Sequence, residues 1–544
     1  MSGAGCTSLP RLAPWLLLMV AAVEFVLFDQ IGARRITRFY PRWDDQVQYL
    51  SEAYQAHETA RREGFGAGLR QAWLTPSAQG TLHDVYGVVA FQLAGPSRSA
   101  ALALNLLALL AWQATLFAAV SAVRAGPWAA LAAALLPLAL GGPWEIIPGS
   151  AYDFRLDHLA MCCLGVASGF AVLSDGFRHR GWSLAFGGAA GITLLARHLS
   201  GTYLLLVFLA AGLWLAVSAA RRRRLVNWVL AGFATAALAG PFLWISRDRI
   251  VDYYWIGHFV GPESVVRASG ASVLGSLGFV FDQLGSRHLG AFFGGVAVLG
   301  VVLFALGRGA RRPVPDGLWL AGVAFLLAPA VIFTLHRQKS EVVVSALVPG
   351  VVLLVLAAWL AAAGAPAERS PWRGWLPLLL PLICLGFFGQ RQCRPAYDAA
   401  AVTQLHTVNT LADELYRRVI LAPFPEPNLA IDHLNDALNA EVLRVIFYER
   451  HRRWLPIRMT LPTGVVAPDP DDVQARLARS HLVLLTDEPA PAGLYPFDHT
   501  LATLRPQLRS WCEIHLRPTG KFTVLGRTMT LYQHPGIPFA PSSP

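Results

Sequence analysis

An acid pair follows an arginine cluster near the start of the chain. Asp44 and Asp45 lie in the stretch "RFYPRWDDQVQYL", and four arginines precede them, namely Arg34, Arg35, Arg38 and Arg42. A carboxylate can take a proton from an attacking hydroxyl, and guanidinium groups bind phosphate through paired hydrogen bonds. Because the stretch follows an apolar run of membrane-spanning length, this chemistry would take place at a bilayer surface. Carboxylates in the first turn of a helix are also ordinary capping and dipole residues, so the pair needs support from elsewhere in the chain.

Further ionisable residues stand at the ends of later apolar runs. A single such residue is usually an interfacial ion pair or a snorkelling side chain. Several that gather on one side of a membrane indicate a functional site instead, because charge is otherwise avoided there. The candidate substrate-binding residues are His83, Asp84, Asp153, Arg155, Asp157, Arg197, His258, His336, Arg337 and Lys339.

The composition requires a membrane to position these residues. Only 15% of the 544 residues are charged, 54% are hydrophobic and the mean hydropathy is +0.45. Soluble domains carry about 25% charged residues. The net charge of +11 comes from arginines in short loops between apolar runs, which favours membrane orientation over nucleic-acid binding. The cysteines are scattered and have no zinc-site spacing.

Apolar runs of about 20 residues, the length of a membrane span, recur from Leu12 to Gln390. We expect about eleven transmembrane helices on this length criterion. The expected spans are 12–32, 98–121, 127–147, 156–174, 183–198, 199–219, 226–245, 288–307, 317–335, 342–362 and 374–390.

Arginine-rich short loops predict which ends of the spans face the cytoplasm. These loops include "RHR" at 178–180, "RRRR" at 221–224 and "RGARR" at 308–312. The other side then receives a first outer loop at 33–97, a second at 246–287 and the C-terminal segment 391–544. We expect a bacterial inner-membrane protein whose C-terminal segment lies outside the cytoplasm. The ionisable residues cluster at the ends of the spans on that outer side.

Two soluble features are expected on the outer side. Residues 43–55 predict a helix with an apolar stripe of Trp43, Val47, Leu50 and Tyr54. In 391–544, "NLAIDHLNDALNAEVLRVIFYERHRRW" predicts a strand and a helix, "SHLVLLTDEP" a buried strand, and "KFTVLGRTMTLYQH" two alternating strands. The fold class is therefore a polytopic α-helical membrane domain, 1–390, followed by a small α/β domain, 391–544.

Carboxylates and arginines at a membrane surface suit transfer of a sugar from a lipid phosphate. Arginines would stabilise the leaving phosphate, and a carboxylate would deprotonate the acceptor hydroxyl. The acid pair after the first span, the many-helix body and the outer tail resemble the GT-C superfamily, which includes protein O-mannosyltransferases and aminoarabinose transferases. The resemblance covers 1–390 and implies that Asp44 or Asp45 is the catalytic base. It also implies phosphate-binding roles for Arg197 and for the late turn "HRQKSEVVVSALVP", where relatives often carry Pro-Arg-Tyr.

The resemblance implies an inverting glycosyltransferase that uses a polyprenyl-phosphate sugar donor and a glycan, lipid or protein acceptor. A secondary transporter is one alternative, although transporters place their ionisable residues near the middle of the bilayer. A non-catalytic envelope assembly protein is the other. The sequence leaves open the identity of the sugar, and whether a divalent cation bridges Asp44 or Asp45 to the phosphate.

Overall fold

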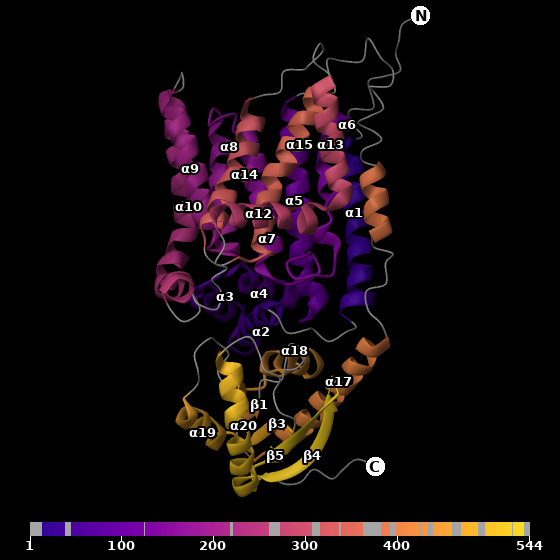
Figure 1. The fold of residues 1–544 in the computed structure, drawn as a ribbon, viewed down its shortest axis with the longest axis vertical. Helices are drawn as coiled ribbons and strands as arrows, with labels where there is room; N and C mark the ends of the chain where they lie inside the picture. The colour runs from indigo at the N-terminus through magenta and orange to yellow at the C-terminus, as the bar shows by residue number, and fades with distance from the viewer. Residues whose placement is uncertain are drawn as a thin grey trace, which may run out of the picture.

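The computed structural model describes most of the chain. The described residues are 13–37, 45–123, 126–217, 221–260, 272–306, 316–336, 339–362, 382–391, 399–423, 427–431, 439–459, 469–487, 496–524 and 526–537. They form a bundle of long apolar helices, a layer of more polar helices at one end of it, and a sheet with its helices beyond that layer (Figure 1).

Apolar helices build the bundle. Its long helices are α1 (Ala13–Ile31), α5 (Arg98–Ala122), α7 (Leu156–Leu173), α8 (Arg180–Ala196), α9 (Ser200–Val217), α10 (Arg221–Ile250), α13 (Gly290–Leu306), α14 (Asp316–Leu335) and α15 (Val348–Ala362), with shorter α12 (Val273–Gln283) beside α14. Within the described residues, eight helical segments are long and apolar enough to cross a membrane. The chain is thus a multi-pass membrane protein.

Eight of the eleven expected spans overlap these segments, and the other three differ. The expected span 127–147 is a shorter helix, α6 (Pro127–Leu135), which tightens into a 3₁₀ turn over Leu136–Ala139. Pro137 in that turn has no N–H to continue the helix. The expected span 183–198 is α8, a helix of 17 residues packed between α7 and α10. The expected span 374–390 begins outside the described residues, which resume with a helix over 382–391.

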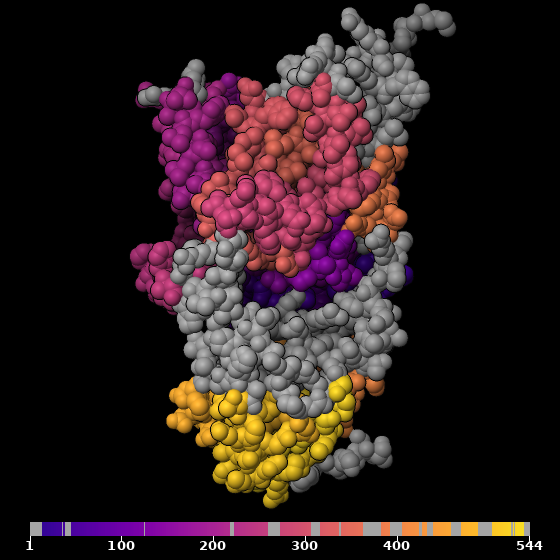
Figure 2. Space-filling model, in the orientation of Figure 1, coloured from indigo at the N-terminus to yellow at the C-terminus, as the bar shows by residue number. Residues whose placement is uncertain are grey.

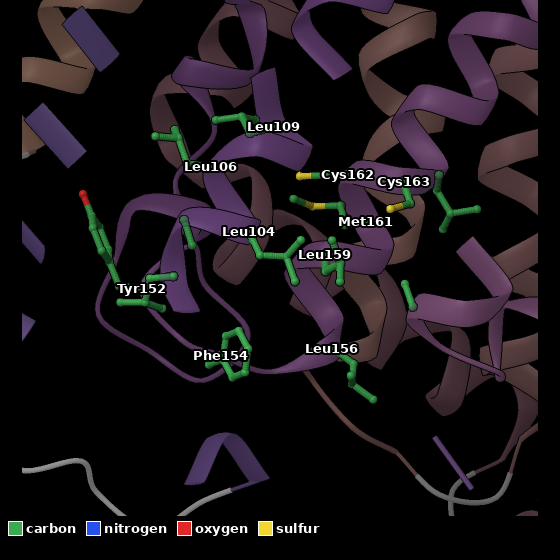
Figure 3. Close-up of a cluster of buried hydrophobic side chains, with 14 of the residues drawn as sticks. Leu104, Leu106, Leu109, Tyr152, Phe154, Leu156, Leu159, Met161, Cys162 and Cys163 are labelled. Carbon is green, nitrogen blue, oxygen red and sulfur yellow. The ribbon is translucent and has the colours of Figure 1, made fainter. Parts of the chain in front are cut away.

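The core of the bundle lies between α5 and α7. Trp112 of α5 is fully buried, and its ring occupies the space that a side chain at Gly165 of α7 would need, 2.4 Å from an added Cβ. Glycine at this position therefore allows the two helices to approach closely. Figure 3 shows the same helices supplying Leu106, Leu109 and Cys162 to one apolar cluster.

One acid lies within a span rather than at its end. Glu24 in the middle of α1 is fully buried, and its Oε1 accepts a hydrogen bond of 3.1 Å from Gln113 of α5. Hydrogen bonds between polar side chains hold neighbouring helices together inside a membrane. An ionisable residue is therefore buried in the middle of a span as well as at the span ends, where the sequence places the others.

The segment expected to be the first outer loop forms a helical layer. Its helices are α2 (Asp45–Glu63), α3 (Phe65–Leu74) and α4 (Leu82–Ala94). The helix expected over 43–55 is confirmed from Asp45 onward, and Val47, Leu50 and Tyr54 of its apolar stripe are buried. Trp43 lies outside the described residues. Figure 2 shows part of this indigo layer below the magenta and orange helices.

The C-terminal segment carries a five-stranded sheet in the order β2-β1-β3-β5-β4. Its strands are β1 (Leu429–Ile431), β2 (Ile457–Met459), β3 (Leu482–Thr486), β4 (Arg517–Val524) and β5 (Arg527–Gln533). β1 pairs in parallel with β2 and β3, and β5 runs antiparallel to β3 and β4. The accompanying helices are α17 (Ala399–Leu421), α18 (Ala440–His451), α19 (Pro470–Ala478) and α20 (Pro496–His515).

Helix α18 packs directly on α2. The Tyr54 hydroxyl of α2 donates a 2.8 Å hydrogen bond to Glu449, and the Tyr448 hydroxyl donates a 3.1 Å bond to Glu58. Arg98, at the start of α5, lies 3.5 Å from the Glu449 carboxylate and also donates to the backbone carbonyl of Thr37. The C-terminal segment is therefore attached to the helix that follows the acid pair.

Candidate active site

Four of the predicted residues form one ion-pair network beside the layer of α2, α3 and α4. Asp45 begins α2, Arg155 and Asp157 stand at the start of α7, and Arg197 directly follows α8. Nη2 of Arg155 lies 2.5 Å from Oδ2 of Asp45, and its Nε lies 3.5 Å from Oδ2 of Asp157. Nη1 of Arg197 pairs with Oδ1 of the same Asp157. Residues from three distant segments thus meet in a single cluster of alternating charge.

Asp153 joins this network from the loop that precedes α7. Its Oδ2 lies 3.9 Å from Nε of Arg155 and accepts a 2.6 Å hydrogen bond from the backbone N–H of Gly149. Asn105, fully buried on α5, donates to the carbonyls of Ala151 and Asp153 at 3.1 and 2.8 Å. A buried amide therefore fixes the loop that positions Arg155 and Asp157.

The break between α8 and α9 is held by the loop before α4. The backbone N–H of His198 donates to the Gln79 carbonyl at 2.7 Å, and that of Thr81 donates to the Leu195 carbonyl at 2.9 Å. Gly80 approaches so closely that an added Cβ would lie 2.5 Å from the carbonyl oxygen of Ala196. Because only glycine fits there, the loop can hold Arg197 at the end of α8.

Tyr49 is a site residue that the sequence reasoning missed. It is buried on α2, and its hydroxyl donates to the side chain of Gln79. Burial, with the negative charge of Asp45, raises the pKa of Tyr49 well above its usual range, while Arg197 and Arg155 oppose this shift. The signal that could have found it is its spacing from Asp45, since residues four apart share one face of a helix.

Arg197 has a hydrogen-bond donor that the described residues do not use. Its Nη1 is used by Asp157, whereas its buried Nε has no hydrogen-bond partner among the described residues. Its side chain is 14% exposed, so the guanidinium is accessible but largely desolvated. A planar guanidinium with free donors is suited to bind a phosphate through two hydrogen bonds.

No family model and no curated protein matches the sequence. Among solved structures, the chain is similar to ArnT from Cupriavidus metallidurans bound to undecaprenyl phosphate, with a TM-score of 0.60, 15% identity and coverage of 97% of this chain and 99% of that one. It is also similar to the archaeal oligosaccharyltransferase AglB from Archaeoglobus fulgidus, in complex with an inhibitory peptide and a dolichol-phosphate. There the TM-score is 0.51 with 12% identity, over 98% of this chain and 75% of that one. The chain has the GT-C fold. The resemblance read from the sequence is thereby confirmed at the level of the fold.

In this GT-C fold, His83 and Asp84 lie on α4 behind the network. The His83 ring is buried between Tyr49 and Phe154, with centroid distances of 5.9 and 4.5 Å. Burial lowers its pKa to about 3, so the imidazole is neutral. Burial, together with the charge of Glu52, raises the pKa of Asp84 well above its usual range. The structure therefore places His83 against Tyr49, behind the network, whereas Asp84 interacts with Glu52 of α2.

Three other candidates gather at the end of α14. The rings of His258 and His336 lie 5.5 Å apart, edge to face. The Lys339 ammonium donates to the carbonyls of Phe333, Thr334 and His336 at 2.7, 3.1 and 2.7 Å. Three such bonds use all the donors of an ammonium group, so Lys339 caps the C-terminal end of α14. Arg337 lies outside the described residues.

Asp44 also lies outside the described residues, directly before α2. Its neighbour Asp45 is half exposed and engaged by Arg155. Within the part of the chain that the structure describes, no group of three or more His, Cys, Asp or Glu side chains is arranged to hold a metal ion.

Proposed function

We propose that the protein is a membrane glycosyltransferase that takes its sugar from a polyprenyl-phosphate donor. The observation that carries the proposal is the network of Asp45, Arg155, Asp157 and Arg197, at one end of a bundle with the GT-C fold. The two similar structures are described with undecaprenyl phosphate and with a dolichol-phosphate, and both ligands are lipid phosphates. These likenesses support a lipid-phosphate donor for this chain.

Arg197 is the proposed ligand of the donor phosphate, with Arg155 beside it. The free Nε of Arg197 supports this role, since Arg155 is already engaged by Asp45 and Asp157. An arginine fork stabilises the negative charge that develops on the leaving phosphate. Arg337 and the pair of His258 and His336 are proposed to line the donor entrance.

Asp44 is the proposed general base. The ion pair between Asp45 and Arg155 supports this choice, because it commits Asp45 to holding the start of α2 against α7. In the reaction, Asp44 takes the proton of an acceptor hydroxyl and the hydroxyl oxygen attacks the anomeric carbon. The bond from that carbon to the phosphate oxygen then breaks, with inversion, and the lipid phosphate leaves.

The proposed location of this chemistry is the outer face of a bacterial inner membrane. The arginines at 178–180 and 221–224 lie at the end of the bundle opposite the network, which supports a cytoplasmic position for that end. The sheet and helices of 399–537 would then form an outer α/β domain. The acceptor is proposed to be a hydroxyl of a glycan, lipid or protein.

The test is donor consumption by the full chain in lipid nanodiscs. Radiolabelled polyprenyl-phosphate sugars are supplied with envelope extract as the acceptor source, and release of polyprenyl phosphate is measured for the natural protein and for Asp44→Asn. We expect release that depends on Asp44. If a solute crosses sealed vesicles while no donor is consumed, the protein is a transporter and the proposal fails.

A further inference from the structure

A second binding feature lies at the opposite end of the bundle from the charge network. It is a cavity of about 870 Å³ between the end of α7, the turn at 174–178, residues 206–214 of α9 and residues 316–331 of α14. Helix α7 begins beside Arg155 and ends at this cavity. Its 18 residues separate the two places by about 27 Å at 1.5 Å per residue.

The cavity is an apolar groove that opens sideways. Leu209 and Leu213 of α9, and Leu320 and Leu327 of α14, line it and are exposed, as side chains facing lipid are. Phe325 lines it from the buried side. The lining of α14 runs from Asp316 to Val331, about 22 Å along the helix axis. This exceeds half of a hydrocarbon core about 30 Å thick, so the groove is long enough for one lipid chain of a single leaflet.

A buried guanidinium closes one end of this groove. Arg224, in the first turn of α10, is 8% exposed and lines the cavity. Its Nε is buried and makes no hydrogen bond to the described residues. The Arg224 side chain also forms no ion pair with any of the described residues. Its one described interaction is a cation–π contact, 5.7 Å from the ring centre of Trp214. A buried charge without an anion is unfavourable, so the site favours an anionic ligand.

The other charged residues of the lining do not supply that anion. Asp175 is already paired with Arg178 at 2.8 Å. Asp316 stands in the first turn of α14, where the helix dipole favours a carboxylate, and it forms no ion pair with Arg224. Exposed Arg222 and Arg223 add positive charge beside the groove. Clusters of arginine next to a span attract anionic lipid headgroups.

We propose that this groove holds one anionic phospholipid, with an acyl chain along α9 and α14 and its phosphate on Arg224. The phosphate end of this site is separate from the proposed donor site, because Arg197 stands at the opposite ends of α8 and α9. The apolar lining of α14 runs toward the other end of the bundle and stops at Val331, five residues before His336. A lipid bound here fills the space between α7, α9 and α14 and so stabilises the bundle.

The test is native mass spectrometry of the full chain, exchanged into detergent with equal amounts of phosphatidylglycerol and phosphatidylethanolamine. We expect the natural protein to retain phosphatidylglycerol at least about tenfold over phosphatidylethanolamine. Both lipids carry the phosphate, but the ammonium of phosphatidylethanolamine brings a like charge next to the desolvated Arg224, and such a repulsion within several ångströms costs about 2 kcal/mol. Arg224→Gln should abolish the preference. Arg223→Gln removes the same charge from the exposed neighbour and should keep it.

A second variant tests the groove in case Arg224→Gln does not fold. Ala324→Phe fills the middle of the groove and leaves every charge in place, so it should reduce retention of the lipid itself. Equal retention of the two lipids by the natural protein would overturn the proposal, as would a loss in Arg223→Gln as large as in Arg224→Gln. Displacement of phosphatidylglycerol by a polyprenyl phosphate at this site would also overturn it, and would assign the groove to the donor tail.

Discussion

Arg197 and Asp157 allow the proposed donor site to be tested by two substitutions with opposite expected signs. Nη1 of Arg197 is held by Asp157, which is 3% exposed, so this carboxylate competes with a phosphate for the guanidinium. Arg197→Ala removes two charged hydrogen bonds to the phosphate. Each is worth about 1.5–3 kcal/mol in a desolvated site, so even one net bond predicts a loss of about 10- to 150-fold in affinity.

Asp157→Asn should have the reverse effect on binding. It keeps the shape of the side chain and removes the competing charge, so affinity for a polyprenyl phosphate should stay equal or increase. Arg197→Lys keeps the charge without the fork and should lose about tenfold. The measurement is titration of a polyprenyl phosphate into the protein in nanodiscs, with Arg70→Ala, an exposed arginine of α3, as the control.

The stability of each variant separates binding from folding. Removing one partner of a buried ion pair costs about 3–5 kcal/mol when no second partner remains, but Arg155 stays within 3.5 Å of Asp157. Arg197→Ala should therefore remain folded, with a modestly lower unfolding temperature. The reasoning is refuted if Asp157→Asn weakens binding as much as Arg197→Ala, because the ion pair would then have only a structural role.

Three further outcomes are expected. Asp44→Asn should lower turnover by about 10²–10⁴-fold, the usual contribution of a general base. Asp45→Asn should lower turnover less, because Asp45 positions α2. A comparable loss in both variants would contradict this division of roles. Asn105→Leu leaves two buried carbonyls of the loop before α7 without hydrogen-bond donors and should destabilise the protein by about 1–3 kcal/mol. The unfolding temperature should fall in Asn105→Leu, and also in Asn105→Ala. Burial lowers the pKa of His83 to about 3, whereas the unfolded chain has the ordinary value of 6.5. The folded state is therefore fully stabilised by the neutral ring above pH 6.5, and this stability is lost as the pH falls from 6.5 toward 3. At pH 5 this loss is about 2 kcal/mol, and His83→Gln should remove it from the pH profile of unfolding; an unchanged profile would show that the ring is not buried as a neutral group.

Local patterns predicted the elements that carry the site. The spacing of Val47, Leu50 and Tyr54 gave α2, because a helix buries one face and these residues share it. The polar break at Arg197 marked the boundary between α8 and α9, since charge interrupts two apolar runs there. The weak point was the stretch after Leu135, where an apolar composition suggested a span and Pro137 ends the helix.

Pairings across the fold could not be predicted in this way. The bond between Arg155 and Asp45 joins residues 110 apart in the sequence, and periodicity carries no information at that range. The capping role of Lys339 depends on the path of the backbone after α14, which one basic residue in a turn does not reveal. Tyr49 was overlooked because an aromatic residue on an amphipathic helix usually belongs to the core.

The attachment of α18 to α2 sets the time at which α2 can be fully packed during synthesis. The Tyr54 hydroxyl bonds to Glu449, 395 residues later in the chain. At about 5–20 residues per second, a ribosome needs about 20–80 s to cover that distance. During this interval α2 is already made, while the helix that packs on it does not yet exist. The growing protein therefore passes most of its synthesis with α2 lacking its packing partner, and α2 gains that partner only when Glu449 has been added.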